Sequence, residues 1–154
     1  MSSTTETALM SLLAPLSGQA VPLEQVPDDV FSQKILGDGI AIIPADGKLY
    51  APVDGKIASI AETLHAYGFT SENGMEILVH VGLDSVALKG EGFKSHVQLG
   101  DKVKKGQLIA EVDLKFLESK GVPTITSVLI CEGAEDLKMN TVTGNVRAGK
   151  DTVI

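Results

Sequence analysis

The stretch Met75-Glu-Ile-Leu-Val-His-Val-Gly-Leu-Asp84 alternates between apolar residues and other types, with His80 near its middle. Because side chains along an extended strand point alternately to opposite faces, this pattern predicts a strand with one wholly apolar face. That face would carry Met75, Ile77, Val79 and Val81, and the opposite face Glu76, Leu78, His80 and Gly82. Burying an imidazole without a partner or a task is costly, and imidazole titrates near neutral pH. The pattern therefore marks His80 as a candidate functional residue.

Turn signals divide the rest of the chain into short segments that are typical of strands. The turns are indicated by dipeptides that tolerate positive φ, namely Asp-Gly at 38–39, 46–47 and 54–55 and Asn-Gly at 73–74. Helical patterns occur only at residues 28–36 and 113–120. Besides the strand at 75–81, strands are expected at residues 16–23, 39–44, 49–53, 55–60, 65–70, 93–97, 108–112, 125–130 and 152–154.

The residues between these segments are partly repeated along the chain. Ala14-Pro-Leu-Ser-Gly18 recurs as Ala51-Pro-Val-Asp-Gly55, and each copy leads into a predicted strand. Prolines and glycines at strand ends suit a sandwich whose strands bend and switch sheets. The chain is 44% hydrophobic but only 4% aromatic, so the core must be built from aliphatic side chains. These features predict an all-β fold, an antiparallel β-sandwich with short helical segments.

The net charge of −7 restricts the kinds of partner that the surface favours. An acidic surface repels the phosphates of nucleic acids and attracts basic proteins, so we expect no nucleic-acid binding. The single cysteine, Cys131, excludes an intrachain disulfide and fits a reducing compartment. No apolar run approaches the roughly 20 residues of a membrane span, and the N-terminus lacks the basic region of a secretory signal. These features predict a soluble, cytoplasmic protein.

The first residues of the chain differ in composition from the rest. They are rich in serine and threonine, and only a short apolar run, 9–13, follows. We expect residues 1–12 to form a flexible arm or a linker remnant and residues 13–154 to form one folded domain. A short helix that touches a membrane is the alternative, although this segment has no basic face to support it.

A second histidine, His65, lies fifteen positions before His80. Thr63 precedes His65 by two residues, so in an extended segment its hydroxyl can orient the imidazole. Two imidazoles on neighbouring strands would form a two-histidine site, but the pattern is equally compatible with histidines that only pack against their neighbours. Asp84 likewise has three interpretations: it can pair with His80, bind an arginine of a partner, or cap the following turn.

Several motifs along the chain carry a resemblance to a known family. They are Ala14-Pro-Leu-Ser-Gly18, Val26-Pro-Asp-Asp-Val-Phe31, Gly37-Asp-Gly-Ile-Ala41, Ala51-Pro-Val-Asp-Gly55, Thr63-Leu-His-Ala66, His80-Val-Gly-Leu-Asp84, Leu88-Lys-Gly-Glu-Gly-Phe93 and Gly100-Asp-Lys-Val-Lys-Lys-Gly106. Together they make the chain similar to the glucose-type enzyme IIA domain of the bacterial phosphoenolpyruvate-dependent sugar phosphotransferase system. The resemblance runs from Ala14 almost to the C-terminus, and it implies a barrel-sandwich hybrid with a duplicated hybrid motif.

The resemblance also implies roles for individual residues. His80 matches the phosphorylated histidine and His65 the second active-site histidine, whose imidazole Thr63 orients. Gly82 would offer its backbone carbonyl to Nδ1–H of His80, which leaves Nε2 as the nucleophile. The partner-binding face carries over to apolar contacts and two arginine-binding acids, namely Val30, Phe31, Leu36, Leu78, Val86, Asp28 and Asp84. Some relatives have aromatic residues at the positions of Ala61 and Leu78 and an acid at that of Ala87.

By this resemblance the chain is expected to act as a phosphocarrier in coupled sugar uptake and phosphorylation. It would accept a phosphoryl group from phospho-HPr on His80 and pass it to a cysteine of a IIB domain. It would bind no sugar itself, require no cofactor and work in the cytoplasm beside a membrane permease. His65 and His80 are also candidate ligands for a regulatory zinc, completed by a carboxylate from a partner.

Other functions are compatible with parts of the same pattern. His80 and Asp84 match a zinc half-site of lysostaphin-type peptidases, but only His96 follows them, and catalytic zinc usually needs three protein ligands. The region 100–113 is similar to biotinyl and lipoyl carriers, but the modified lysine between methionines is missing. A regulatory module that binds other proteins according to its phosphorylation state is a third alternative.

Overall fold

The computed structural model describes residues 11–132 and 141–154. Its strands are β1 (Gly18–Pro22), β2 (Asp38–Pro44), β3 (Lys48–Tyr50), β4 (Gly55–Ile60), β5 (Ala66–Ser71), β6 (Glu76–Val81), β7 (Phe93–Ser95), β8 (Lys102–Val103), β9 (Leu108–Val112), β10 (Thr126–Glu132) and β11 (Gly144–Val146). The helical segments are α2 (Asp29–Ser32), α3 (Leu114–Ser119) and the 3₁₀ turns η1 (Leu23–Gln25) and η2 (Ser85–Leu88). Strands thus dominate the fold, and every helical segment in these ranges is short.

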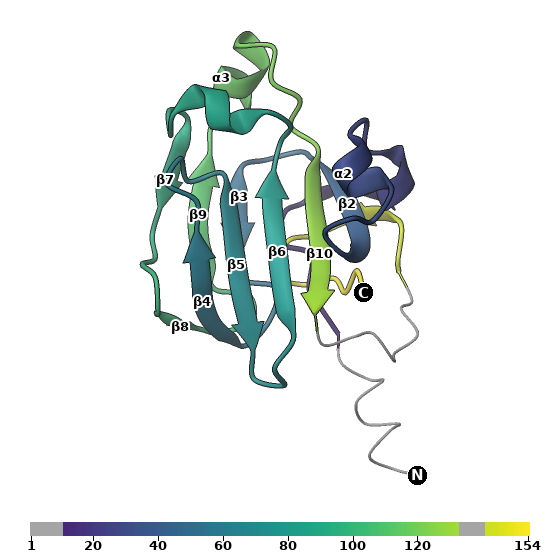
Figure 1. Cartoon of the computed structure of the whole chain (residues 1–154), viewed down its shortest axis with the longest axis vertical. Coiled ribbons are helices and arrows are strands. Elements are labelled where there is room, and N and C mark those ends of the chain that lie inside the picture. The colour runs from purple at the N-terminus through teal and green to yellow at the C-terminus, as the bar shows by residue number, and fades with distance from the viewer. Residues whose placement is uncertain (1–10, 133–140) are drawn as a thin grey trace.

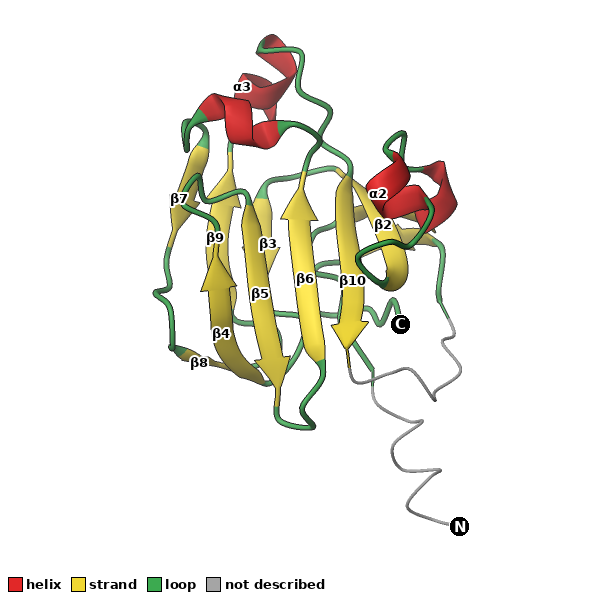
Figure 2. Ribbon diagram, viewed as in Figure 1, coloured by secondary structure: helices red, strands yellow, loops and turns green. Residues whose placement is uncertain are grey.

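The strands form two sheets, and every strand pairing in them is antiparallel. The larger sheet has the order β11-β1-β2-β10-β6-β5-β4-β8, and the smaller one the order β3-β9-β7. Figures 1 and 2 show β4, β5, β6 and β10 side by side, with β3 and β9 behind them. This arrangement confirms the predicted all-β antiparallel sandwich.

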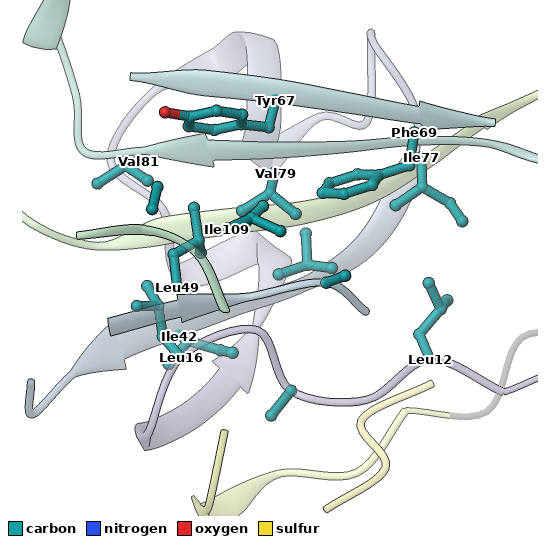
Figure 3. Close-up of a cluster of buried hydrophobic side chains, with 14 of the residues drawn as sticks. Leu12, Leu16, Ile42, Leu49, Tyr67, Phe69, Ile77, Val79, Val81 and Ile109 are labelled. Carbon is teal, nitrogen blue, oxygen red and sulfur yellow. The ribbon is translucent and has the colours of Figure 1, made fainter. Parts of the chain in front are cut away.

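The core lies between the two sheets and follows the alternation of the strands. In β6 the side chains of Ile77, Val79 and Val81 are buried, whereas those between them are only half-buried, as the sequence pattern predicts. Figure 3 shows these residues together with aromatic and aliphatic side chains from both sheets, including Tyr67, Phe69, Leu49 and Ile109. Because the inner face is filled by this core, the alternate residues of β6 are left for the outer face.

A second apolar cluster, the outer cluster, lies apart from this core. It contains Val21, Leu23, Val26, Phe31, Ala41, Leu83 and Leu129, with Leu78, Ile125 and Cys131 packed against it. Several members come from the segment that carries η1 and α2, and Figure 1 shows α2 beside β2 and β10. The larger sheet therefore has an apolar outer surface next to the half-buried residues of β6.

The element boundaries differ from the sequence expectations in a few places. The strands at 55–60 and 108–112 match β4 and β9, but residues 152–154 contain only an isolated bridge, between Thr152 and Leu13. The N–H of Leu12 donates to the carbonyl of Ile154, one residue out of register with this bridge, so the pairing does not continue as a ladder. β8 and β11 were not expected, because segments this short have no clear strand pattern of their own. They are strands because they pair with β4 and β1, respectively.

The helix expected at 28–36 is shorter than its sequence pattern suggested. The side chain of Asp28 accepts a hydrogen bond from the N–H of Val30 and caps α2, but the helix ends at Ser32. Lys34 has a φ of 61°, in the left-handed region, and this conformation stops the helix. The remaining residues of the pattern, Ile35 and Leu36, are left exposed beyond the helix end.

The boundary between the expected arm and the folded domain also needs a correction. Most of the expected arm, residues 1–10, lies outside the described residues. Leu12, however, is fully buried in the core, and its backbone exchanges hydrogen bonds with Val153 and Ile154. Leu12 is therefore part of the folded unit rather than of a flexible arm, because it closes the core against the C-terminal segment.

Within residues 11–132 and 141–154, no helix is both long enough and apolar enough to cross a membrane.

The hydroxyl of Tyr67 is a polar group inside the core. It is fully buried and has no hydrogen-bond partner of good geometry among the described residues. Ser95 lies close enough to oppose in part the burial that raises the pKa of Tyr67. The hydroxyl of Ser95, however, donates its hydrogen bond to the carbonyl of Val97 over 2.8 Å. The hydroxyl of Tyr67 therefore loses its hydrogen bonds to water on folding without gaining an equivalent one in the described part of the protein.

Removing this hydroxyl should stabilise the protein. A buried polar group without a good partner is destabilising, so Tyr67→Phe should raise the free energy of unfolding by about 1 kcal/mol. Urea denaturation of both proteins measures the change, with Tyr50→Phe, at a half-buried tyrosine, as the control. A clear loss of stability in Tyr67→Phe would show that the hydroxyl has a stabilising partner after all.

Candidate active site

His80 lies on the outer face of β6 and is half-buried. Its Nδ1 is 3.0 Å from the backbone carbonyl oxygen of Gly82. Because a carbonyl oxygen can only accept a hydrogen bond, Nδ1 carries the proton, and in the neutral ring Nε2 keeps a free lone pair. The backbone of the next turn thus sets the tautomer of His80 and leaves Nε2 able to act as a nucleophile.

Gly82 holds a conformation that few other residues could adopt. Its φ is +76°, and a Cβ at this position would lie 2.7 Å from the carbonyl oxygen of Pro123 and 2.7 Å from Oγ of Ser85. Both the backbone conformation and the close packing therefore require glycine here. Any larger residue would clash with the carbonyl of Pro123 and the hydroxyl of Ser85.

His65 lies directly before β5 and is only 9% exposed. Its Nδ1 is 2.6 Å from Oγ1 of Thr63. The contact was expected from an extended segment, but these residues form a turn in which Leu64 has a φ of 62°. A hydroxyl can donate to Nδ1 or accept from it, so this contact orients the ring in either tautomer. The other nitrogen, Nε2, is not used by this contact.

The fold brings the two histidines together from neighbouring strands. β5 and β6 pair so that Ala66 lies opposite His80, and the N–H of Val81 donates to the carbonyl of His65 over 2.8 Å. The centroids of the two rings are 4.9 Å apart, with an angle of 79° between the ring planes. The ring of Phe31 also lies 4.9 Å from that of His80. His80 therefore has a second imidazole and an aromatic ring as direct neighbours.

Burial lowers the pKa of both histidines below the ordinary value of 6.5. For His80, burial is the largest cause, and the carbonyl of Gly82 and the charge of Asp28 oppose it in part. For His65, burial is again the largest cause, and the nearby ring of His80 lowers the pKa further. Both rings are therefore neutral near pH 7, the state in which an imidazole can act as a nucleophile.

The expected partner-binding residues differ in their exposure, and of these Phe31 and Asp28 interact with His80. Val30 and Leu36 are 40% and 44% exposed, Leu78 is half-buried, and Phe31 is buried in the outer cluster. Of the acids, Asp28 is half-buried at the start of α2 and Asp84 is exposed. The side chain of Val86 lies outside the described part of the structure.

Two features of this region were not expected from the sequence. Ile35 is 65% exposed beside Leu36, because α2 ends before the helical pattern does. Ser85 is fully buried and packs against Gly82, where its hydroxyl meets the backbone. The helical pattern contained Ile35, but no periodic signal could have identified Ser85, since its contacts depend on how the turn folds back.

The candidate zinc ligands are His65 and His80, and the third histidine of the chain is His96. In 11–132 and 141–154, no group of three or more His, Cys, Asp or Glu side chains is placed to hold a metal ion. His96 lies away from the site, and its Nε2 contacts Oε2 of Glu111 over 2.6 Å. A zinc ion at His65 and His80 would need at least one further ligand from outside these described residues.

The lowered pKa values predict how stability changes with pH. Well above pH 6.5 both rings are neutral whether the chain is folded or unfolded, but as the pH decreases through 6.5 the unfolded chain gains protons first. Stability should therefore fall as the pH decreases through this value, until the folded rings also gain protons. Thermal unfolding at several pH values measures this fall, which His80→Gln should make shallower.

The matched control for this experiment is His96→Gln, at a histidine that faces a carboxylate on the surface. This substitution should not flatten the decrease. A pH dependence that is the same in His80→Gln as in the unchanged protein would show that His80 is not desolvated.

Three comparisons relate this chain to known proteins. The family model described as phosphoenolpyruvate-dependent sugar phosphotransferase system, EIIA 1, matches residues 10–135. The chain is 46% identical over 121 residues to a glucose-specific EIICBA component of that system from Staphylococcus saprophyticus, and 48% identical over 129 residues to a glucosamine-specific one from Bacillus subtilis. These alignments cover 79% and 83% of this chain but only 18% and 20% of the relatives.

A solved structure, glucose permease IIA from Mycoplasma capricolum, has the same fold as this chain. The two structures superpose with a TM-score of 0.87 at 36% sequence identity, over 94% of this chain and 93% of the other. The family model, the sequence relatives and the shared fold agree with one another. The chain therefore belongs to the EIIA 1 family of the phosphoenolpyruvate-dependent sugar phosphotransferase system, as a glucose-type IIA domain.

Proposed function

We propose that this chain is a phosphocarrier that accepts a phosphoryl group from phospho-HPr on His80 and passes it to a cysteine of a IIB domain. The observation that carries the proposal is the contact between Nδ1 of His80 and the carbonyl of Gly82. It leaves Nε2 with its lone pair on the outer face of the larger sheet. The lowered pKa of His80 keeps this nitrogen unprotonated near neutral pH.

The first step is a displacement at phosphorus. The lone pair of Nε2 forms the new bond to phosphorus, while the bond from phosphorus to the donor atom breaks and its electron pair stays with HPr. The ring of His80 then carries positive charge, which its Nδ1–H shares with the carbonyl of Gly82. In the second step a thiolate of the IIB domain attacks phosphorus, and His80 leaves as a neutral ring.

His65 would stabilise the phosphoryl oxygens during both steps. If the hydroxyl of Thr63 donates to Nδ1 of His65, the proton of that ring lies on Nε2, where it can be donated to a phosphoryl oxygen. The adjacent rings place this donor close to His80. Such preorganised donors act most strongly where charge develops in the transition state.

The surface around His80 suits a protein partner rather than a small substrate. Exposed apolar side chains at Val30, Ile35 and Leu36 lie in one segment, next to the outer cluster that holds Phe31. Asp28 and Asp84 add negative charge that suits arginines of HPr and of the IIB domain. The apolar surround would exclude water when a partner is bound and so limit hydrolysis of the phosphoryl group.

The proposal includes no cofactor and no contact with the sugar. Phosphoryl transfer between protein side chains needs only positioned nucleophiles and donors, both of which the two histidines provide. The relatives that span more than this chain are named glucose-specific and glucosamine-specific, but these names describe those proteins. We place the chain in the cytoplasm beside a membrane permease, where a IIB domain could receive the phosphoryl group.

His80→Gln should abolish phosphate acceptance, because glutamine has no imidazole nitrogen to attack phosphorus. The measurement is incubation with radiolabelled phosphoenolpyruvate, enzyme I and HPr, followed by acid treatment, since a phosphohistidine is labile in acid. The unchanged chain should become labelled at His80. Undiminished labelling of His80→Gln would rule out the assignment of the nucleophile.

His65→Gln should still accept the phosphoryl group but pass it on poorly. Loss of one donor to the phosphoryl oxygens is expected to slow transfer to a IIB domain by roughly 100-fold. Rapid mixing of the labelled variant with a IIB domain measures this rate. His96→Gln, remote from the site, serves as the control and should transfer normally. Normal transfer by His65→Gln would remove His65 from the mechanism.

A further inference from the structure

The peptide units Val81–Gly82 and Gly82–Leu83, at the end of β6, form the backbone whose carbonyl His80 contacts. In the first unit, the carbonyl of Val81 accepts a hydrogen bond from the hydroxyl of Ser85, and the N–H of Gly82 donates to Ile125 over 3.1 Å. In the second, the carbonyl of Gly82 accepts from His80, and the next N–H donates to Pro123 over 3.1 Å. Each unit is therefore fixed at both of its ends.

Ser85 is the only side chain that donates a hydrogen bond to the backbone of these two units apart from His80 itself, among the described contacts. Ser85 is fully buried at the first position of η2, and its hydroxyl donates to the carbonyl of Val81 over 2.5 Å. A buried carbonyl without a partner is costly, so the hydroxyl has a clear reason to stay in place. Its position thereby fixes the plane of the Val81–Gly82 peptide.

The same serine acts on Gly82 by packing. A Cβ on Gly82 would lie only 2.7 Å from Oγ of Ser85, so the hydroxyl occupies the space directly beside this residue. A rotation of the Val81–Gly82 peptide would change the φ of Gly82, which is +76°, and would turn its carbonyl away from Nδ1 of His80. The hydroxyl of Ser85 opposes that rotation.

Val81 also connects Ser85 to the second histidine. The N–H of Val81 donates to the backbone carbonyl of His65 over 2.8 Å, while its carbonyl accepts from Ser85. Displacement of Val81 would therefore alter the backbone of both histidines at once. In contrast, the side chain of Thr63 forms its hydrogen bond with the ring of His65.

We propose that Ser85 is a positioning residue for phosphoryl transfer, which holds the Gly82 carbonyl on Nδ1 of His80 through the Val81–Gly82 peptide. This inference rests on the proposed function of His80 as the phosphoryl acceptor. Without the hydroxyl, the carbonyl of Gly82 is held less firmly, and the ring of His80 populates the tautomer with its proton on Nε2. That tautomer has no lone pair on Nε2 and cannot attack phosphorus.

Ser85→Ala tests the inference with two measurements on the intact chain. Nitrogen NMR of the imidazole reports which nitrogen of His80 carries the proton, and the labelling reaction with phospho-HPr reports the rate of acceptance. We expect the Nε2–H tautomer to become the major form and the rate to fall about tenfold, the loss expected for one hydrogen bond. A rate that falls without any change of tautomer overturns the inference, as does a change of tautomer without a slower rate.

Ser71→Ala provides a matched control for a purely structural effect. Ser71 is also buried, and its Oγ accepts a hydrogen bond from the N–H of Met75, ahead of β6 and at the end of that strand remote from His80. This substitution should lower the melting temperature but leave the tautomer and the acceptance rate unchanged. If Ser85→Ala behaves in the same way, Ser85 has only a structural role and the inference is wrong.

A second pair of variants covers the case in which Ser85→Ala does not fold. Ser85→Thr and Ser85→Val have nearly the same shape and differ in the hydroxyl. The threonine variant should keep the tautomer and the rate, and the valine variant should lose both; equal behaviour of the two overturns the inference. If the unchanged chain accepts no phosphate on His80, the proposed function fails, while the NMR comparison still decides whether Ser85 sets the tautomer.

Discussion

The hydrogen bond from Nδ1 of His80 to the carbonyl of Gly82 is the interaction on which the chemistry of the site depends. An imidazole has two nitrogens that compete for one proton, and a fixed acceptor beside one of them resolves that competition. A backbone carbonyl suits this task, because it cannot donate and therefore permits only one tautomer. The left-handed conformation of Gly82 aims the carbonyl, and no residue with a Cβ fits in its place.

The surroundings of the histidines balance two opposing demands. Burial favours the neutral rings and lowers the pKa of both, whereas Asp28 and the carbonyl of Gly82 favour the charged form of His80. In the proposed phosphoryl transfer, a neutral ring is needed to attack phosphorus, and a stabilised cation is needed once the bond has formed. Half-buried His80, with one carbonyl and one nearby carboxylate, suits both demands of that proposal.

The two faces of β6 have different roles in the sandwich. The inner face of β6 fills a core that involves both sheets, while its outer face carries His80 beside the outer cluster. The exposed apolar side chains Val30, Ile35 and Leu36 belong to the segment around α2, which lies beside the site instead of in the core. The position of His80 is thus set by the most buried part of the molecule, although a partner protein can approach from the other side.

Local features of the sequence determined much of this protein. The period-two pattern of β6 assigned its two faces, and Asn73-Gly74 marked the turn between β5 and β6, where Gly74 has a φ of 87°. The Asp-Gly pair at 38–39 lies inside β2 instead, and Thr63 contacts His65 through a turn rather than along an extended segment. Only the tertiary structure decided the rest: the burial of Leu12, the early end of α2, the short strands β8 and β11, and the contacts of Ser85. These depend on hydrogen bonds and packing between segments that are distant in the chain or fold back on themselves, and periodicity carries no record of such pairings.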